Sequence, residues 1–241
     1  MCGCELEEKQ METYNQPTQE RILSAAAKLF AIKGYNGTTT REIVAEAGSS
    51  LSSIQFHFKS KENLYQAALE RTLSIFYDLN ASLLSEIDET ERHGLLSGAS
   101  AWDMIVELTG QVTEWVFCEE YNYEILLINR ELLYPSAIFK RMPNSVLGLY
   151  KYYEKLFEAY VGVKDTFWAK SLSFSIVASI FDFGIYPYIM GQVLECDTED
   201  PKNIPRIKTH MKHYLLSSMQ AYLIARKQEV SEVSKERKID E

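Results

Sequence analysis

Apolar residues recur at three- and four-residue intervals through nearly every stretch between glycines and prolines, and alternating strand-like patterns are almost absent. This spacing gathers apolar side chains on one face of a helix. Hydrophobic residues make up 46% of the 241 residues, which is enough to fill a real core. The pattern therefore predicts an all-α protein of about nine helices.

The N-terminal part of the chain combines one longer helix with short ones. Apolar spacing predicts a helix over about 18–33, and Gly34 follows as a C-cap. Thr39 and Glu42 have the spacing of a capping box, so a second helix begins there and ends before Gly48. This second helix has only two turns.

A third helix of similar length is predicted over 51–57, and Ser60 would cap a long fourth helix reaching toward residue 89. Two short helices joined by a tight glycine-containing turn and packed on a longer helix are typical of a helix-turn-helix DNA reader. The expected small core of this unit consists of Phe30, Ile43, Val44, Ile54 and Phe58.

Nine polar or aromatic residues in this region have the chemistry to contact DNA. Gln55 can pair with adenine, and Phe56 can lie against a sugar or a thymine methyl group. Arg41 and Lys61 can hold phosphates, which fixes position rather than sequence. The predicted DNA-contacting residues are Thr40, Arg41, Ser50, Ser52, Ser53, Gln55, Phe56, His57 and Lys61.

The charge is distributed unevenly along the chain. The formal net charge is −9, whereas residues 17–64 contain six basic and four acidic residues and carry +2, so the remainder carries −11. Phosphate neutralisation by Lys and Arg supplies most non-specific DNA affinity. The asymmetry indicates a chain that touches DNA with one small end and repels it elsewhere.

The ordered motifs of the first 70 residues resemble those of the TetR family. They read Arg21-Ile22-Leu23, Ala25-Ala26, Leu29-Phe30, Gly34-Tyr35, Thr39-Thr40-Arg41-Glu42-Ile43, Ala47-Gly48 and Phe56-His57-Phe58-Lys59-Ser60-Lys61-Glu62-Asn63-Leu64. The resemblance implies a homodimeric repressor that binds double-stranded operator DNA and is released by a small ligand. The two recognition helices of such a dimer would lie about 34–36 Å apart, or a multiple of that, on an inverted repeat.

Two positions depart from the commoner family pattern. Val44 stands where a small alanine usually lets the helices approach, and Ser49 stands where an aliphatic residue usually plugs the turn. Leu51 could take over the role of the plug or could face DNA, and the sequence leaves this open.

Beyond residue 90 the family diverges, so the second part is interpreted from its residues. Five longer helices are expected near 101–118, 123–133, 144–161, 165–189 and 203–227. We divide the chain into a disordered leader (1–16), a DNA-binding domain (17–64), a ligand-binding and dimerisation domain (65–228) and a charged tail (229–241). The stretch from Arg130 to Ala137 also resembles a CecR-like branch of the family.

The second part is rich in aromatic residues, which can line an apolar ligand pocket or simply fill a helical core. Arg130 could bind an anionic group of the ligand or pair with Glu131 or Glu154, and the ion pair is the slightly favoured reading. The predicted ligand-binding residues are Trp102, Trp115, Arg130, Tyr134, Phe139, Tyr153, Phe157, Phe174 and Phe181.

The helices near 165–189 and 203–227 are expected to pair with their copies in a four-helix dimer interface. In this hypothesis, a ligand among the sensor helices shifts the long fourth helix and changes the separation of the two readers.

No uninterrupted apolar run reaches the roughly 18 residues of a membrane span, and the first ten residues are acidic and polar, unlike a signal peptide. A cytoplasmic protein without membrane contact is expected. Cys118 and Cys196 are expected to be free thiols. The pair Cys2 and Cys4 could hold a soft metal or form a redox bridge, although its spacing does not match the usual zinc motifs.

An enzyme is the first alternative function. The histidines and acids form no recognisable nucleophile, metal or acid–base set, and His210 and His213 alone make a weak metal pair, so neither a cofactor nor a catalytic residue is predicted. The second alternative is an interaction protein or DNA-binding regulator without a small-molecule inducer. It differs in predicting that no small molecule changes operator affinity.

Overall fold

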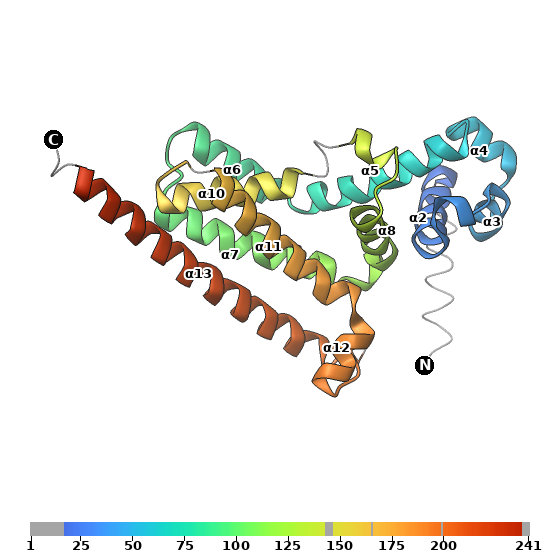
Figure 1. Cartoon of the computed structure of the whole chain (residues 1–241). Helices are drawn as coiled ribbons and strands as arrows, with labels where there is room; N and C mark the ends of the chain where they lie inside the picture. The colour runs from blue at the N-terminus through green and yellow to red at the C-terminus, as the bar shows by residue number, and fades with distance from the viewer. Residues whose placement is uncertain (1–16, 143–146, 165, 199, 238–241) are drawn as a thin grey trace. The chain divides into compact units, whose positions relative to one another are not determined.

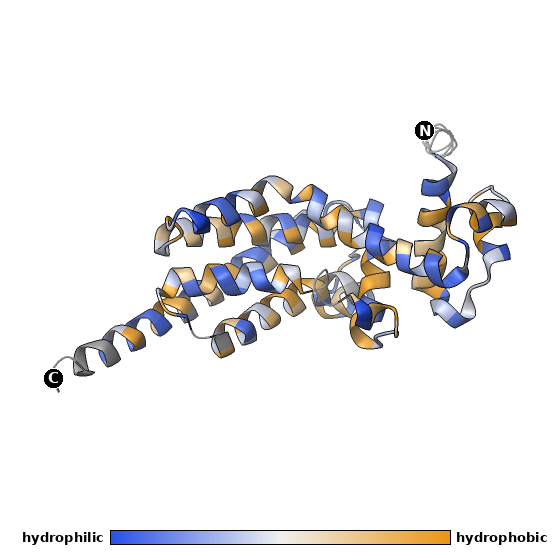
Figure 2. Ribbon diagram, turned by 90° about the horizontal axis from the view of Figure 1, so that it is seen from above, coloured by the Kyte–Doolittle hydropathy of each residue, from blue (hydrophilic) through white to orange (hydrophobic). Residues whose placement is uncertain are grey.

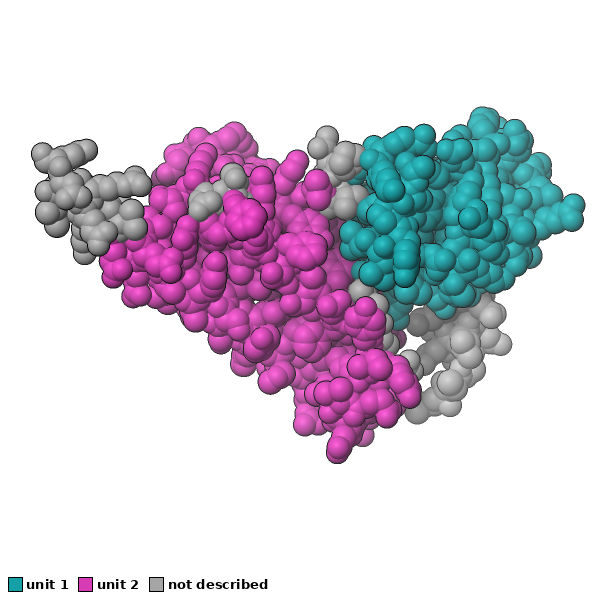
Figure 3. Space-filling model, in the orientation of Figure 1, with its two compact units in different colours: residues 1–75, 121–143 teal, residues 76–120, 144–241 magenta. Residues whose placement is uncertain are grey.

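The computed structural model describes residues 17–142, 147–164, 166–198 and 200–237. Over these residues the chain is all-helical, as predicted, with eleven α-helices instead of about nine (Figure 1). The predicted leader, including Cys2 and Cys4, lies outside the described residues. The chain forms two compact units: residues 1–75 with 121–143, and residues 76–120 with 144–241 (Figure 3). The predicted domain boundary after residue 64 stays a prediction.

The first unit contains the N-terminal helices and a helix from later in the chain. Its elements are α2 (Thr18–Gly37), α3 (Thr40–Glu46), α4 (Leu51–His57), most of α5 (Lys61–Leu79), α8 (Asn122–Leu133) and the 3-10 turn η2 (Phe139–Arg141). The helix α2 packs against α3, α4 and α8. All five residues of the predicted small core are buried: Phe30, Ile43, Val44, Ile54 and Phe58.

Positive backbone φ angles mark the turns of this unit. Gly34 has φ +73° and interrupts α2 before its last residues, so the predicted cap position is a kink within the helix. Gly48 has φ +56° in the turn between α3 and α4. Both positions use the left-handed region that glycine enters without steric cost.

The long fourth helix is shorter than predicted. The helix α5 ends at Leu79, and α6 (Ala81–Arg92) follows after Asn80 instead of continuing α5 toward residue 89. Asn80 is buried, and its Nδ2 donates to the carbonyl of Phe76 over 2.6 Å. This local hydrogen bond competes with the helical backbone pattern, which is a signal that apolar spacing does not carry.

The second unit consists mainly of α6, α7 (Gly98–Val116), α10 (Gly148–Val161), α11 (Thr166–Ile185), α12 (Pro187–Leu194) and α13 (Ile204–Arg237). The helix α10 packs against α7, α11 and α13, and α7 also packs against α6, α11 and α13. Hydrophobic residues recur among hydrophilic ones along these helices (Figure 2). The buried side chains Ile105, Leu108, Leu156 and Phe157 belong to the core of this unit.

Two helices of the second unit end differently from prediction. The expected helix over 165–189 ends at Ile185, and α12 begins at Pro187. Proline disfavours helical geometry in the residue before it, and Tyr186 accordingly has φ −111° and ψ 50°. The helix α13 continues to Arg237, so most of the predicted charged tail (229–241) is helical.

Within the described ranges, no single helix is both long and apolar enough to cross a membrane. Only one pair of helices, 167–184 and 188–194, reaches that length and hydropathy when the two are taken together, and the chain bends sharply between them.

Candidate DNA-binding interface and effector region

The second helix begins at the predicted capping box. The backbone N–H of Glu42 donates to Oγ1 of Thr39 over 3.2 Å, and the Glu42 carboxylate accepts from the backbone N–H of Thr39 over 2.7 Å. A hydrogen bond from Lys33, followed by those from Thr39, lowers the pKa of Glu42 to about 2. The start of α3 is therefore fixed by its own sequence.

Two exposed ion pairs join α2 to α3. Lys28 pairs with Glu46 at 2.5 Å, and Lys33 pairs with Glu42 at 2.7 Å. These pairs neutralise two of the six basic residues counted in the N-terminal region. Of the other four, Arg21 donates to the carbonyl of Gly48 over 3.4 Å, and Arg41, Lys59 and Lys61 are the cations that remain to meet phosphate.

The helix α4 presents a polar and aromatic surface. Ile54 faces the core, whereas Ser52, Gln55, Phe56 and His57 are exposed, with Phe56 at 73%. The side chain of Ser50 caps α4 by accepting from the backbone N–H of Ser53 over 3.3 Å. The side chains predicted to reach bases are thus exposed on one helix, except Ser53, which is half-buried and whose hydroxyl lies 3.0 Å from that of Ser50.

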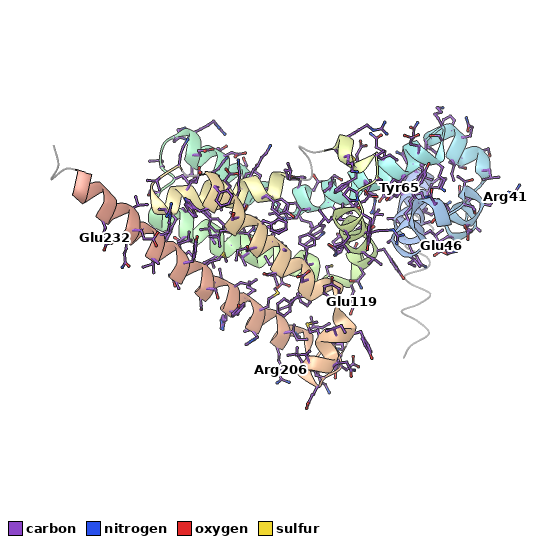
Figure 4. The ribbon with its side chains drawn as sticks, viewed as in Figure 1. Arg41, Glu46, Tyr65, Glu119, Arg206 and Glu232 are labelled. Atoms are coloured by element: carbon purple, nitrogen blue, oxygen red, sulfur yellow. The ribbon has the colours of Figure 1, made fainter. Side chains whose placement is uncertain are left out.

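The predicted phosphate-binding residues stand at the starts of two helices. Arg41 is exposed in the first turn of α3, and it makes no ion pair within the described part of the chain (Figure 4). The Nζ of Lys61 lies 4.3 Å from the centre of the Tyr35 ring at the start of α5. Thr40 is half-buried beside Arg41. A helix start supplies free N–H groups that suit a phosphate.

The structure resolves the open role of Leu51. Its side chain is 46% exposed, so it faces outward and does not plug the turn. Ser49 Oγ is buried without a hydrogen-bond partner among the described residues, and Val44 is buried at 9% exposure. The core of the turn thus contains a hydroxyl group that has lost its contact with water and gains no hydrogen bond among the described residues in return.

Buried polar contacts join α8 to α5 and α2 inside the first unit. The Tyr65 hydroxyl donates to Oε1 of Glu131, and Oε2 of Glu131 accepts from the backbone N–H of Ser136 over 2.8 Å (Figure 4 labels Tyr65). Tyr65 and Glu131 are 1% and 2% exposed. Burial, and then the bond to Glu131, raises the pKa of Tyr65 above its ordinary range.

A second contact of this kind centres on Arg71 of α5. Its guanidinium pairs with Glu20 of α2 and, at 2.7 Å, with the buried Glu124 of α8. Neither ion pair of Arg71 could be predicted from the sequence, because Glu20 and Glu124 are each more than fifty positions away from Arg71 in the chain.

Three of the predicted ligand-binding residues belong to the first unit. Arg130 is exposed and packs against Gly34, where an added Cβ would lie 2.4 Å from Nη2 of Arg130. The favoured ion pair with Glu131 or Glu154 is wrong, since Arg130 forms no ion pair among the described residues, whereas Glu131 accepts from Tyr65 and Ser136 and Glu154 pairs with Lys170. Tyr134 is 81% exposed, and Phe139 is buried at 7% exposure.

The other six predicted ligand-binding residues lie in the second unit, where they form several aromatic contacts instead of lining one pocket. The rings of Trp115 and Phe181 are 5.9 Å apart, and those of Tyr153 and Phe157 are 5.7 Å apart. Trp102 contacts Tyr160, and Phe174, which is 63% exposed, stacks on Tyr150 at 6.3 Å.

One polar atom in this second set lacks a partner. Trp115 is 5% exposed, and its Nε1 is buried without a hydrogen-bond acceptor within the described residues. Its ring also lies 5.1 Å from Phe76. Trp115 is therefore an unpaired donor inside an aromatic cluster.

A cavity of about 700 Å³ lies elsewhere in the second unit, at the junction of α11, α12 and α13. None of the predicted ligand-binding residues lines it. The missed signal is the apolar stretch from Tyr186 to Leu194, because the predicted helix ended at residue 189 and no separate helix was predicted after it. The described residues contain no cluster of His, Cys, Asp or Glu suited to a metal.

A short helix pair with a glycine turn, a capped recognition helix and an exposed polar face defines the class of helix-turn-helix DNA readers. Residues 22–68 match the family model described as bacterial regulatory proteins, tetR family. The N-terminal helices of this chain therefore form a DNA-binding region of the tetR type. The resemblance stated from the sequence is thus confirmed for these residues.

Among curated relatives, the HTH-type transcriptional regulator QacR of Staphylococcus aureus is 49% identical over 47 residues, covering 20% of this chain and 25% of QacR. The chain therefore matches only about a quarter of that relative. The HTH-type transcriptional dual regulator CecR of Shigella flexneri is 24% identical over 153 residues, covering 63% of this chain and 68% of CecR. CecR is one distant relative among many, so membership of a CecR-like branch stays a prediction.

The fold also resembles solved structures. The regulator AibR, in complex with isovaleryl coenzyme A and operator DNA, superposes with a TM-score of 0.61 at 17% identity, covering 83% of this chain and 98% of AibR. At this identity the likeness concerns the fold.

Proposed function

We propose that this protein is a homodimeric, cytoplasmic repressor that binds an inverted-repeat operator and is released by a small, partly apolar effector. The observation that carries the DNA-binding part is the exposed face of α4, where Ser52, Gln55, Phe56 and His57 lie together above the buried Ile54. Gln55 reads adenine, and Phe56 contacts a sugar or thymine methyl group.

Phosphate contacts flank this face. Arg41 and Thr40 at the start of α3 and Lys61 at the start of α5 bind backbone oxygens, helped by the free N–H groups of those helix starts. The ion pairs of Lys28 and Lys33 keep two further cations bound to α3. They set the orientation of α3 and do not add charge for DNA.

Dimerisation uses the outer faces of α11 and α13. The side chains of Phe174, Tyr214, Tyr222 and Ile224 are 63%, 62%, 46% and 44% exposed, an apolar area that a second copy would cover. A two-fold dimer then presents two copies of α4 to successive major grooves.

The effector is placed beside Trp115. The unpaired Nε1 donor of this residue, together with Phe76 and Phe181, provides an apolar site with one polar handle. The bound isovaleryl coenzyme A of AibR makes a short acyl-coenzyme A the first effector class to examine. Release requires that the effector prefer one of two states of the helical domain.

The test is a fluorescence-anisotropy titration of the full chain with the DNA that flanks its coding region, first alone and then with isovaleryl coenzyme A. We expect tight, salt-sensitive binding to one site, and release by isovaleryl coenzyme A but not by coenzyme A alone. Trp115→Phe should weaken the release, whereas the control Trp168→Phe, which removes another buried Nε1 without a partner among the described residues, should leave it intact.

The experiment can contradict the DNA-binding part and the effector part of the proposal independently. A folded protein that binds no specific site in this DNA contradicts the DNA-binding part. Site-specific binding that isovaleryl coenzyme A leaves unchanged removes this effector class and favours a regulator without such an inducer.

A further inference from the structure

The cavity at the junction of α11, α12 and α13 has the size and lining of a small-molecule site. Its volume of about 700 Å³ falls within the roughly 300–1,000 Å³ of ligand pockets. Four apolar side chains on its rim stay exposed, namely Tyr186, Ile189, Val193 and Leu194, at 48%, 57%, 73% and 47%. Such an apolar concavity is a typical feature of a binding surface.

Polar groups gather on one wall of the cavity. Asn203 precedes α13, and Arg206 and His210 follow at three- and four-residue intervals, so the three share one side of the chain. Figure 4 shows Arg206 near the start of α13, next to α12. A convergent polar group in an apolar lining is what orients a ligand.

Among the described residues, Arg206 has a single hydrogen-bond partner, Asn203. It stands in the first turn of α13, where the helix dipole disfavours a cation. Across the described ranges it forms no ion pair, and its one hydrogen bond, to Oδ1 of Asn203, is long at 3.5 Å. Its remaining guanidinium donors are available to an anion.

A carboxylate also lines the cavity and restricts where an anion can lie. Asp182 comes from α11 and forms no ion pair with Arg206. Because like charges repel, the anionic end of a ligand would lie toward α13 and away from Asp182.

We propose that this cavity binds an amphipathic carboxylate, with the carboxylate on Arg206 beside His210 and the hydrocarbon chain against Ile189 and Val193. This site is distinct from the effector region around Trp115, since it shares no residue with it. The proposal does not rest on DNA binding and is tested without DNA.

The first experiment titrates the full chain with decanoate, and with decanol as an uncharged probe of equal chain length, by calorimetry at pH 7.5. Cys196 lines the cavity and serves as a reporter. Its rate of alkylation by iodoacetamide is followed by peptide mass spectrometry, with Cys118 as the internal reference. We expect saturable decanoate binding, weaker decanol binding, and decanoate protection of Cys196 but not of Cys118.

Substitutions then test the role of charge. Arg206→Gln should weaken decanoate binding about three- to tenfold, the effect of losing one partly solvated charge-assisted contact, and leave decanol binding unchanged. Lys202→Gln removes the same charge four residues earlier, outside the lining, and should have no effect. Asp182→Asn should strengthen decanoate binding.

Three outcomes would overturn the proposal. The first is no decanoate binding by the folded protein. The second is an equal loss from Arg206→Gln and Lys202→Gln, which indicates general charge attraction. The third is an alkylation rate of Cys196 that depends on protein concentration and not on decanoate, which indicates that a second copy of the chain covers the cavity.

Discussion

The hydroxyl of Tyr65 donates a hydrogen bond to the carboxylate of Glu131, sixty-six positions later, and both side chains are almost completely buried. Glu131 also accepts from the backbone N–H of Ser136. This contact attaches α8 to α5, the helix that follows the recognition helix in the chain. The hydroxyl of Tyr65 should therefore contribute measurably to the free energy of unfolding of the first unit.

Tyr65→Phe keeps the ring and removes the hydrogen bond, which leaves a buried carboxylate with one fewer donor. We expect a loss of about 1–3 kcal/mol in the free energy of unfolding, measured by urea denaturation. Tyr35→Phe is the matched control, because the two rings touch at 5.1 Å and the Tyr35 hydroxyl has no hydrogen bond recorded in the described part of the chain. Equal stability of both variants and the parent protein would contradict this role.

The capping box of α3 should make the stability of the protein depend on pH in the acid range. The pKa of Glu42 is lowered from 4.5 to about 2, so its stabilising contribution is complete above pH 4.5 and is lost as the pH falls toward 2. Glu42→Gln should remove this part of the acid dependence, and Thr39→Ala should cost about 1 kcal/mol at neutral pH. Thermal unfolding between pH 2 and 7 measures both effects. An unchanged acid profile in Glu42→Gln would refute the assignment.

The unpartnered hydroxyl of Ser49 predicts a stabilising substitution. Ser49→Ala removes a buried polar atom that has no hydrogen bond among the described residues and should raise stability by up to about 1 kcal/mol. Ser52→Ala, at an exposed position of α4, serves as the comparison and should change stability little. A melting temperature that falls in Ser49→Ala would show that the hydroxyl has a partner in solution.

The proposed dimer depends on the exposed face of α13. Tyr214→Glu places a charge in this face and should raise the dissociation constant of the dimer at least about tenfold, because the carboxylate would be buried on association. Tyr188→Glu introduces the same charge on α12 at a side chain that is 74% exposed and should leave the dimer intact. Sedimentation velocity distinguishes the two. A stable dimer in both variants would place the interface elsewhere.

Sequence patterns predicted the elements whose causes are local. The capping box of Thr39 and Glu42, the turn at Gly48 and the helix over 51–57 all depend on residues within a few positions of one another. The break at Asn80 and the separate α12 were missed, since a side-chain hydrogen bond and Pro187 override the apolar spacing there.

Contacts between distant segments lay beyond sequence reasoning. The bond between Tyr65 and Glu131 and the packing of Arg130 on Gly34 require α8 to lie beside α2 and α5, and helix periodicity carries no information about that neighbour. The α12 cavity was missed for the same reason, because three helices contribute to it.

The central claim is that the exposed face of α4 reads DNA sequence while Arg41 binds phosphate. The most direct measurement is the operator affinity of the parent protein, Gln55→Ala and Arg41→Ala as a function of salt concentration. Gln55→Ala should cost about 1–3 kcal/mol on the operator and little on unrelated DNA, and Arg41→Ala should reduce the slope of log affinity against log salt by about 1. Arg92→Ala, on α6, should change neither. If folded Gln55→Ala and Arg41→Ala bind the operator with the parent's affinity and salt slope, α3 and α4 do not form the DNA interface.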